Sequence, residues 1–331
     1  MTNRLLLDKR IAEHEHPASV YLNSRQSENT RYNMARHLNL IAQLLAHDEE
    51  CNALNIDWSA LRYADTAHIH AILINIQNPN GKSKYSASTI NVILSALRGV
   101  LRQAWLLGQM SAEDYHRAII IENVKEENEL SGRRIKYGEI QAVANVCFED
   151  KSDAGARDSA IIGLMATCGL RRSEIVKLQM EDVDIETGEV AIMSGKGNKS
   201  RNVWLRGGAL LAMEDWLHCR RPKLKTTAVF IPINKGGNQE DRQMTSQSVY
   251  KIVQKRSKEA NIDGFSPHDF RRTMISTMLE HNTDLLTVQK IVGHASPATT
   301  QRYDLRSEQQ KKGAAERLHY PHRPRRQQTL I

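Results

Sequence analysis

Two arginines lie where the chain is expected to hold their guanidinium groups in place. Arg171 comes two residues after Gly169, which should end one helix just before the next begins, so Arg171 occupies a tight corner. Arg271 comes three residues after His268, and the Ser-Pro pair before them starts a helix, so both share one face of it. A guanidinium is planar, permanently charged and able to bond two phosphate oxygens at once. The two arginines together predict a phosphate clamp, whereas each alone is typical of an ordinary surface residue.

Three further side chains suit proton transfer or nucleophilic attack. Lys196 lies between two glycines in a turn that joins two expected strands, where it can project and swing. His294 follows Gly293, and Tyr303 comes nine residues after His294, beyond a second Ser-Pro helix start. Lysine and histidine can transfer protons, and a phenol can act as a nucleophile when a base assists it. Taken singly, a basic turn is usually just exposed and a lone tyrosine is usually a packing residue.

In chain order these clusters resemble the motifs of the tyrosine recombinase (phage integrase) family. The resemblance covers about residues 136–305, and five motifs in the family's order and spacing make it specific. No catalytic position departs from the family pattern. The N-terminal region is similar to the family's core-binding domain only in size and helical character. The matching motifs are Gly169-Leu170-Arg171-Arg172-Ser173-Glu174, the turn lysine Lys196, the pair His268 and Arg271, the dipeptide Gly293-His294, and Tyr303.

The resemblance implies DNA strand exchange through a covalent bond between protein and DNA. Tyr303 would attack a phosphodiester to form a 3′-phosphotyrosyl bond, and His268 would accept or orient the phenol proton, because a phenol has a pKa near ~10. Lys196 would give a proton to the departing 5′ oxygen. The energy of the phosphodiester is kept in the new bond, so ATP, a metal or another cofactor is not expected.

The remaining family positions would hold the phosphate. Arg171 and Arg271 would neutralise its two non-bridging oxygens, and His294 would add a hydrogen bond to the same group. Glu174 would orient the neighbourhood of Arg171 or His268 rather than react.

Hydrophobic periodicity places these motifs on a helix-rich chain. Before a polar, charged linker, helices are expected at 28–47, 66–77, 86–107 and from Ser111. After it, helices are expected at 137–148, 157–168, 171–178, 208–219, 245–260, 268–281 and 284–292, with strands at Glu189–Ser194 and Arg201–Leu205. This predicts a mainly α fold with a small antiparallel β-sheet (α+β). The resemblance implies a two-domain DNA clamp, with a helical DNA-binding domain at 1–125, the linker at 126–136, the catalytic domain at 137–310 and a basic tail at 311–331.

The charge of the chain indicates a polyanionic partner. Lys and Arg number 46 against 38 Asp and Glu, a net charge of +8, and nearly all of the excess follows residue 125. Such a chain attracts double-stranded DNA, although charge alone does not separate it from any other basic protein. Contacts to backbone phosphates are expected from several cations, each equally typical of a solvated charge: Lys82, Lys84, Arg98, Arg102, Arg134, Lys136, Lys199, Arg201 and Arg242.

Several classes of protein are disfavoured. The four cysteines are far apart and form no CxxC pair, so neither a disulfide framework nor a zinc site is expected. No apolar run reaches the ~18 residues of a membrane helix and the N-terminus has no signal-peptide core, so we expect no membrane contact and a cytoplasmic location. Residues 182–188 slightly resemble a calcium loop, but their glycine falls one position late. We interpret them as a loop before a strand.

Two other functions are compatible with parts of the sequence. Thr283–Arg302 contains two short helices around Gly293 and is compatible with a helix-turn-helix regulator. That function would leave Arg171, Lys196 and His268–Arg271 without a role. A type IB topoisomerase uses similar chemistry, but the chain length and the Gly-His motif favour a recombinase. Because four protomers act on two sites in the family, the resemblance implies a homotetramer on DNA. Accessory DNA-bending or recombinase partners stay open.

Overall fold

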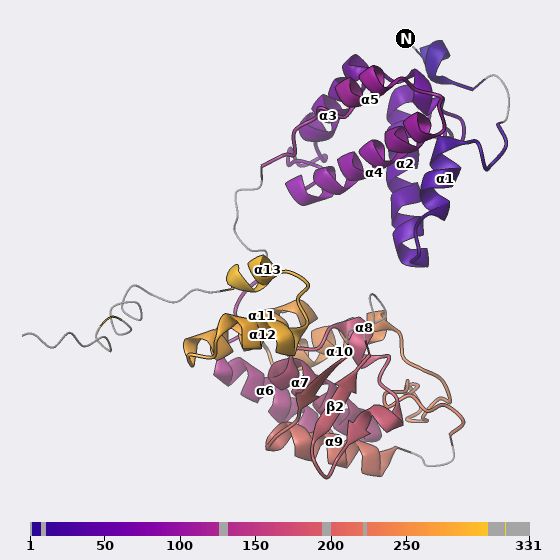
Figure 1. Cartoon of the computed structure of the whole chain (residues 1–331). Coiled ribbons are helices and arrows are strands. Elements are labelled where there is room, and N and C mark those ends of the chain that lie inside the picture. The colour runs from indigo at the N-terminus through magenta and orange to yellow at the C-terminus, as the bar shows by residue number, and fades with distance from the viewer. Residues whose placement is uncertain are drawn as a thin grey trace, which may run out of the picture. The chain divides into compact units, whose positions relative to one another are not determined.

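The computed structural model describes residues 2–7, 11–125, 132–193, 200–220, 224–303 and 315 of the 331-residue chain. The chain divides into two compact units, Met1–Glu129 and Leu130–Ile331 (Figure 1). Each unit has its own hydrophobic core. The division falls within the segment 126–136 that the sequence assigns to a linker. The turn with Lys196 and Lys199 and, apart from residue 315, the basic tail at 311–331 lie outside the described residues.

The first unit is a bundle of helices. Ser27, Ser86 and Ser111 accept backbone N–H groups in the first turns of α2, α4 and α5, as good N-cap residues do. Helix α4 packs against α1, α2, α3 and α5 and buries its apolar face at the centre. The sequence predicted these helices to within a few residues but missed α1, whose cap is His16. The elements are η1 (Thr2–Leu5), α1 (Pro17–Asn23), α2 (Glu28–Ala46), η2 (Trp58–Ala60), α3 (Tyr63–Asn75), α4 (Ala87–Leu106) and α5 (Ala112–Ala118).

The second unit is arranged around α7 (Asp153–Cys168). This helix packs against α6 (Tyr137–Glu149), α9 (Gly208–Cys219) and α11 (Pro267–Glu280), and its buried side chains join the main core of the unit. It begins four residues before the expected start, because its polar first turn gives no apolar signal. The other helices are α8 (Arg172–Ile175), η3 (Met180–Asp182), α10 (Ser246–Glu259), α12 (Leu285–Val292) and α13 (Pro297–Gln301).

A small antiparallel sheet covers part of this core. Its strand order is β1 (Val183–Asp184), β2 (Glu189–Ile192) and β3 (Arg201–Trp204), and Ile192 pairs with Arg201 beside the connecting turn. Strands β2 and β3 match the expected hairpin. Strand β1 was expected to be loop, because two residues are too few to show an alternating pattern. The predicted fold class, mainly α with a small antiparallel sheet, is confirmed.

The C-terminal helices of the second unit form a smaller apolar cluster. Side chains of α11 and α12, among them Ile275, Leu279, Val288 and Val292, pack together with the ring of Tyr303. Helix α12 ends at Gly293, which has a left-handed conformation, and α13 follows directly. This packing places the end of α11, the Gly-His motif and Tyr303 against one another.

All four cysteines of the chain are free thiols in the structure. Cys51, Cys147 and Cys168 are buried, Cys219 is half-buried, and none of the four is in a disulfide. Among the described residues, no cluster of three or more His, Cys, Asp or Glu side chains is arranged to hold a metal ion. In that same part of the chain, no helix has the length and apolar character needed to span a membrane.

Candidate active site

Arg271 is held in the site by two backbone carbonyls. It projects from α11 and is only 2% exposed. Its Nη1 donates to the carbonyl oxygen of Gly169 at 2.6 Å, and its Nη2 donates to that of Val292. The side chain therefore connects α11 to the C-terminal ends of α7 and α12. Burial, with the nearby charge of Arg171, lowers the pKa of Arg271 to about 10, so it is a cation at neutral pH.

Arg171 occupies the corner between α7 and α8. Gly169 ends α7 in a left-handed conformation, and Arg171 is the N-cap residue of α8. The backbone N–H and the Nη1 of Arg171 donate to the Glu174 carboxylate at 2.8 and 2.9 Å, and Nη2 lies 3.4 Å from the carbonyl oxygen of Gly293. The side chain is 43% exposed. Its guanidinium is therefore oriented by Glu174 and remains open to a ligand.

Glu174 is shared between two arginines. Arg201, the first residue of β3, donates from Nη1 and Nη2 to the two carboxylate oxygens at 3.1 and 2.9 Å. Burial by itself raises the pKa of Glu174, but the hydrogen bonds from Arg201 and Arg171 and the charges of both outweigh it and lower the pKa. Glu174 is therefore an anion at neutral pH that orients its neighbours and does not act as a proton donor.

Arg201, one of the residues expected at a DNA phosphate, bonds groups within the protein. Its side chain is 11% exposed, and its Nε donates to the carbonyl oxygen of Ile291 at 2.8 Å. A Cβ added to Gly293 would lie 2.9 Å from its Nη1, so only glycine permits this approach. All of its polar atoms are engaged within the protein. Arg201 thus links β3 and the arginine box to the end of α12.

Tyr303 and His268 meet beside these arginines. The Tyr303 hydroxyl lies 3.3 Å from Nε2 of His268. The tyrosine is only 8% exposed, because its ring packs against the apolar side chains of α11 and α12. Its N–H donates to the carbonyl of Thr300 at 3.0 Å, and its own carbonyl accepts the Ser276 hydroxyl at 3.4 Å. Packing therefore fixes the ring and the backbone, while the hydroxyl faces the polar groups.

His294 is oriented by a buried threonine that the sequence did not assign to the site. Its Nδ1 lies 2.9 Å from Oγ1 of Thr300, which is fully buried, and its ring stacks on that of Tyr303 with centroids 6.2 Å apart. When the Thr300 hydroxyl donates to Nδ1, the neutral ring carries its proton on Nε2 and can donate it to a ligand. Thr300 lies within the Ser-Pro helix before Tyr303, but nothing in its spacing marks it as the partner of His294.

Both histidines are electrically neutral at neutral pH. Burial first, and then the charges of Arg271 and Arg171, lower the pKa of His294 to about 4. Burial and the charge of Arg271 also lower the pKa of His268, with Asp269 acting in the opposite direction. A neutral His268 can accept a proton from the phenol that it contacts. The same arginine charges that would attract a phosphate therefore keep the histidine available as a base.

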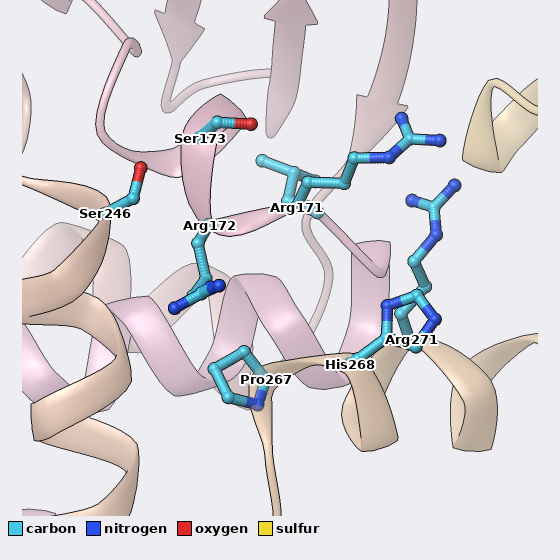
Figure 2. Close-up of a pocket in the computed structure, with 8 residues that line it drawn as sticks. Arg171, Arg172, Ser173, Ser246, Pro267, His268 and Arg271 are labelled. Carbon is cyan, nitrogen blue, oxygen red and sulfur yellow. The ribbon is translucent and has the colours of Figure 1, made fainter. Parts of the chain in front are cut away.

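A pocket of about 360 Å³ opens between the starts of α8, α10 and α11. Arg171, His268 and Arg271 line it, together with Arg172 and Ser246. In Figure 2 the guanidinium groups of Arg171 and Arg271 extend toward the same side of this pocket, with the His268 ring below them. The pocket is thus lined on that side by two cations that could reach one ligand.

The other cations expected at DNA fall into two groups. Lys82, Lys84, Arg102 and Lys136 are exposed. The remaining described ones are engaged with protein groups: Arg98 with Asn123 and the carbonyl of Ile121, Arg134 with Glu280 and Thr277, and Arg242 with Glu240. The bonds of Arg98 connect α4 to the segment after α5. Arg134 and Arg242 remain exposed on one side of their ion pairs.

The arrangement suits attack on a phosphodiester. Among the described residues, Glu174 forms ion pairs with Arg171 and Arg201, whereas Arg271 bonds only backbone carbonyls, so the cluster keeps a net positive charge. Positive groups held in place stabilise the negative charge that builds up on a phosphate in the transition state. The Tyr303 hydroxyl lies beside a neutral base at the edge of this cluster. The structure brings together Arg171, Glu174, His268, Arg271, His294 and Tyr303, and Lys196 lies outside the described residues.

Comparisons with known proteins agree with this geometry. The model of the phage integrase family matches residues 133–310. The tyrosine recombinase XerC of Alcanivorax borkumensis is 32% identical over 254 residues, which cover 74% of this chain and 76% of that protein. The fold is similar to that of the Tn1549 transposon integrase in complex with transposon right end DNA, with a TM-score of 0.68, 14% identity and coverage of 92% of this chain and 98% of the other. It is also similar to that of the XerH site-specific recombinase bound to a palindromic difH substrate, with a TM-score of 0.57, 20% identity and coverage of 94% and 98%. The chain belongs to the phage integrase family and is a tyrosine recombinase.

Proposed function

We propose that this protein is a site-specific DNA recombinase or integrase in which Tyr303 cleaves and rejoins DNA strands. The observation that supports this most directly is the Tyr303 hydroxyl, 3.3 Å from Nε2 of His268, beside a cluster that contains Arg171 and Arg271. A buried tyrosine hydroxyl usually has a hydrogen-bond partner, and here that partner is a histidine beside two arginines. The pairing of a nucleophile with a neutral base next to two phosphate-binding cations is what phosphoryl transfer requires.

In the proposed cleavage step, Arg171 and Arg271 bind the non-bridging oxygens of one phosphate. Nε2–H of His294 donates a further hydrogen bond to it, with Thr300 holding the ring. The Tyr303 oxygen attacks phosphorus while His268 takes the phenol proton, so a bond from phosphorus to the tyrosine oxygen forms as the bond to the 5′ oxygen breaks.

The departing 5′ oxygen needs a proton, and Lys196 is the residue that we assign to give it. The products are a 3′-phosphotyrosyl bond and a free 5′-hydroxyl. In the rejoining step a 5′-hydroxyl from a second strand attacks the phosphotyrosine, the proton returns to Tyr303, and the phosphodiester is restored. Each step exchanges one phosphate ester for another, so the reaction as assigned to these residues is balanced without ATP.

Double-stranded DNA with a pair of recombination sites is the proposed substrate. We propose that the two units close around one duplex, with 1–125 as the helical DNA-binding domain, 126–136 as the linker, 137–310 as the catalytic domain and 311–331 as a basic tail. Four protomers would act on two sites, with accessory DNA-bending or recombinase proteins as further partners. The net charge of +8 supports binding to DNA. We place this reaction in the cytoplasm, where DNA is accessible to the chain.

Covalent capture tests the proposal on a pool of DNA fragments, so no target site has to be chosen beforehand. Sheared DNA from the source genome is incubated with the protein and washed in SDS, and the DNA that stays attached to protein is recovered and sequenced. Wild-type protein should retain one set of sequences, and Tyr303→Phe should retain none. Tyr137→Phe is the matched control, because Tyr137 lies on α6 with 82% of its surface exposed and should leave capture unchanged.

The recovered sequence then distinguishes the other functions. Nicked duplexes that carry the site should form a protein–DNA adduct on a denaturing gel, and two such duplexes should exchange strands. Binding to the site without any adduct would contradict the proposal and indicate a regulator. An adduct with relaxation of supercoils, but without products that join two sites, would indicate a topoisomerase instead.

A further inference from the structure

The active-site pocket extends beyond the groups that the proposed reaction uses. Its lining includes Arg172, Ser173 and Ser246, which have no part in the mechanism above. In Figure 2, the Arg172 side chain extends away from the guanidinium groups of Arg171 and Arg271 and toward Pro267, and Ser246 lies beside the base of Arg172. The pocket has a volume of about 360 Å³. That exceeds the space one phosphate group fills.

Arg172 is held in place without being neutralised. It is half-buried at the start of α8, and its Cζ lies 5.5 Å from the centroid of the Tyr250 ring on α10. A guanidinium over an aromatic face is stabilised and restricted, but it keeps its charge and its hydrogen-bond donors. Within the described residues its side chain is in no ion pair, whereas Arg134, Arg201 and Arg242 each have a carboxylate partner.

Neither Ser173 nor Ser246 provides the capping hydrogen bond at the start of its helix. At the start of α10 the capping bond is made by Thr245, whose hydroxyl accepts the N–H of Ser248, so Ser246 is not needed as a cap. At the start of α8 the Glu174 carboxylate accepts the backbone N–H of the N-cap residue Arg171, so this capping bond does not involve Ser173. Hydroxyl groups and a planar cation are the usual partners of DNA phosphates.

We propose that Arg172, with Ser173 and Ser246, binds the backbone phosphate next to the one that Tyr303 attacks. This inference rests on the proposed function, because it assumes that the Arg171 side of the pocket holds the cleaved phosphate. Arg171 and Arg172 are consecutive residues that line one pocket and whose side chains extend in different directions, which suits consecutive phosphates of one strand. Two fixed phosphates define the direction of the strand as well as its position. Arg172 is then a positioning residue that sets which phosphate faces Tyr303.

The test uses DNA in which one backbone phosphate at a time is replaced by an uncharged methylphosphonate. Each phosphate of the bound duplex is replaced in turn on both strands, and binding is measured by competition with unmodified DNA. The wild-type protein should lose about tenfold in affinity at one position beside the cleaved phosphate, the effect expected for a lost charged hydrogen bond. Arg172→Gln should bind unmodified DNA about tenfold more weakly and should lose nothing further at that same position.

Two controls separate this effect from a general loss of charge or of folding. Lys177→Gln removes a charge from an exposed position close to α8 that does not line the pocket, and it should remain sensitive to the same methylphosphonate. Arg172→Lys keeps the charge, and it should recover part of the affinity and of the sensitivity. Arg172→Gln should also lower the salt dependence of binding by about one phosphate contact, a slope change of ~0.9.

The outcome distinguishes this inference from the proposed function. The losses in binding free energy caused by Arg172→Gln and by each methylphosphonate are compared with the loss when both are present. If they add at every position, Arg172 does not bind a neighbouring phosphate and the inference is overturned. If the losses do not add at one position, the inference stands. The binding measurement does not require cleavage. Absence of a phosphotyrosyl adduct on unmodified DNA would therefore refute the proposed reaction without affecting the interpretation of the binding data.

Discussion

Replacing Arg201 by methionine should weaken the second unit and slow cleavage while leaving DNA binding nearly intact. Methionine keeps the length of the side chain and removes three hydrogen bonds, two to the Glu174 carboxylate and one to the Ile291 carbonyl. The side chains of Arg201 and Glu174 are 11% and 12% exposed, so water replaces the lost bonds poorly. Arg171 would still bond Glu174, so the carboxylate would not be left alone.

The expected loss of stability follows from these contacts. Removing one partner of a buried ion pair costs about 3–5 kcal/mol when the other charge is left unpaired. Because Arg171 continues to pair with Glu174, we expect about 2–3 kcal/mol for Arg201→Met, near the cost of a few hydrogen bonds to a charged group. Arg242→Met is the matched control. Its pair with Glu240 is 59% and 34% exposed, so it should cost less than about 1 kcal/mol.

Hydrogen exchange across a denaturant series measures the second unit separately from the first. Peptides from 160–220 report α7, the arginine box and the sheet, and their unfolding midpoint should fall for Arg201→Met and stay near wild type for Arg242→Met. Single-turnover cleavage of a nicked site should slow by about 10- to 100-fold, the usual cost of misplacing a catalytic group by about 1 Å. The dissociation constant for the same DNA should change little, because the Arg201 guanidinium is directed into the protein.

The competing interpretation gives the opposite pattern. If Arg201 contacted a phosphate, as its sequence position beside the turn suggests, Arg201→Met would weaken binding and lower the salt slope by about one contact, with little change in stability. That result would refute a structural role for Arg201. So would an Arg201→Met variant whose stability and cleavage rate equal those of Arg242→Met. Arg201→Lys should restore part of the stability, since one ammonium can bond Glu174 but cannot reproduce the fork.

Three further predictions concern the same cluster. Tyr303→Phe should abolish the covalent adduct while lowering the unfolding free energy by no more than about 1 kcal/mol, as measured by denaturation, because the ring stays packed and only one hydrogen bond is lost. Gly293→Ala should lower the unfolding free energy by about 1–2 kcal/mol more than Gly237→Ala, measured by the same method. Both glycines have positive φ, but only the methyl group added at 293 contacts Arg201. Equal losses for the two variants would contradict that contact. The pKa of His294 is about 4 in the free protein, and the negative charge of a bound phosphate should raise it. DNA binding should therefore be accompanied by proton uptake, and the affinity for DNA should increase as pH falls from 7 toward 5. Titration of affinity against pH should give a flatter curve for His294→Gln, and identical curves would exclude this histidine as the source.

The fold could be predicted from the sequence wherever a local signal coincided with the tertiary structure. Ser-Pro marked the start of α11, and the glycine after an apolar run marked the end of α7, because these signals act within one turn of helix. Helix α1 was missed because its cap is His16, which is not among the usual capping residues. Strand β1 was missed because its two residues are too short to establish a period.

The residues that position the site were harder to predict than the residues that react. Arg271 and His294 lie in recognisable motifs, whereas Arg201 and Thr300 act through contacts with residues far away along the chain or in another element. One signal for Arg201 was present. In β3 it lies two residues before the buried Val203, so both side chains face the core side of the strand. A charged residue on that face needs an internal partner, and here that partner is Glu174.

The means by which Arg271 is held explains how a buried cation can still attract a phosphate. A carboxylate partner would stabilise the guanidinium but would also cancel most of its charge. Instead its two bonds go to carbonyls at the C-terminal ends of α7 and α12, where peptide groups lack helical partners and the helix dipole is negative. These partial charges orient and stabilise the cation without neutralising it. The left-handed glycines at 169 and 293 end α7 and α12 where the carbonyls of Gly169 and Val292 can accept hydrogen bonds from Arg271. By ending the helices there, the two glycines allow Arg271 to be held without a carboxylate, and its positive charge is kept for the reaction.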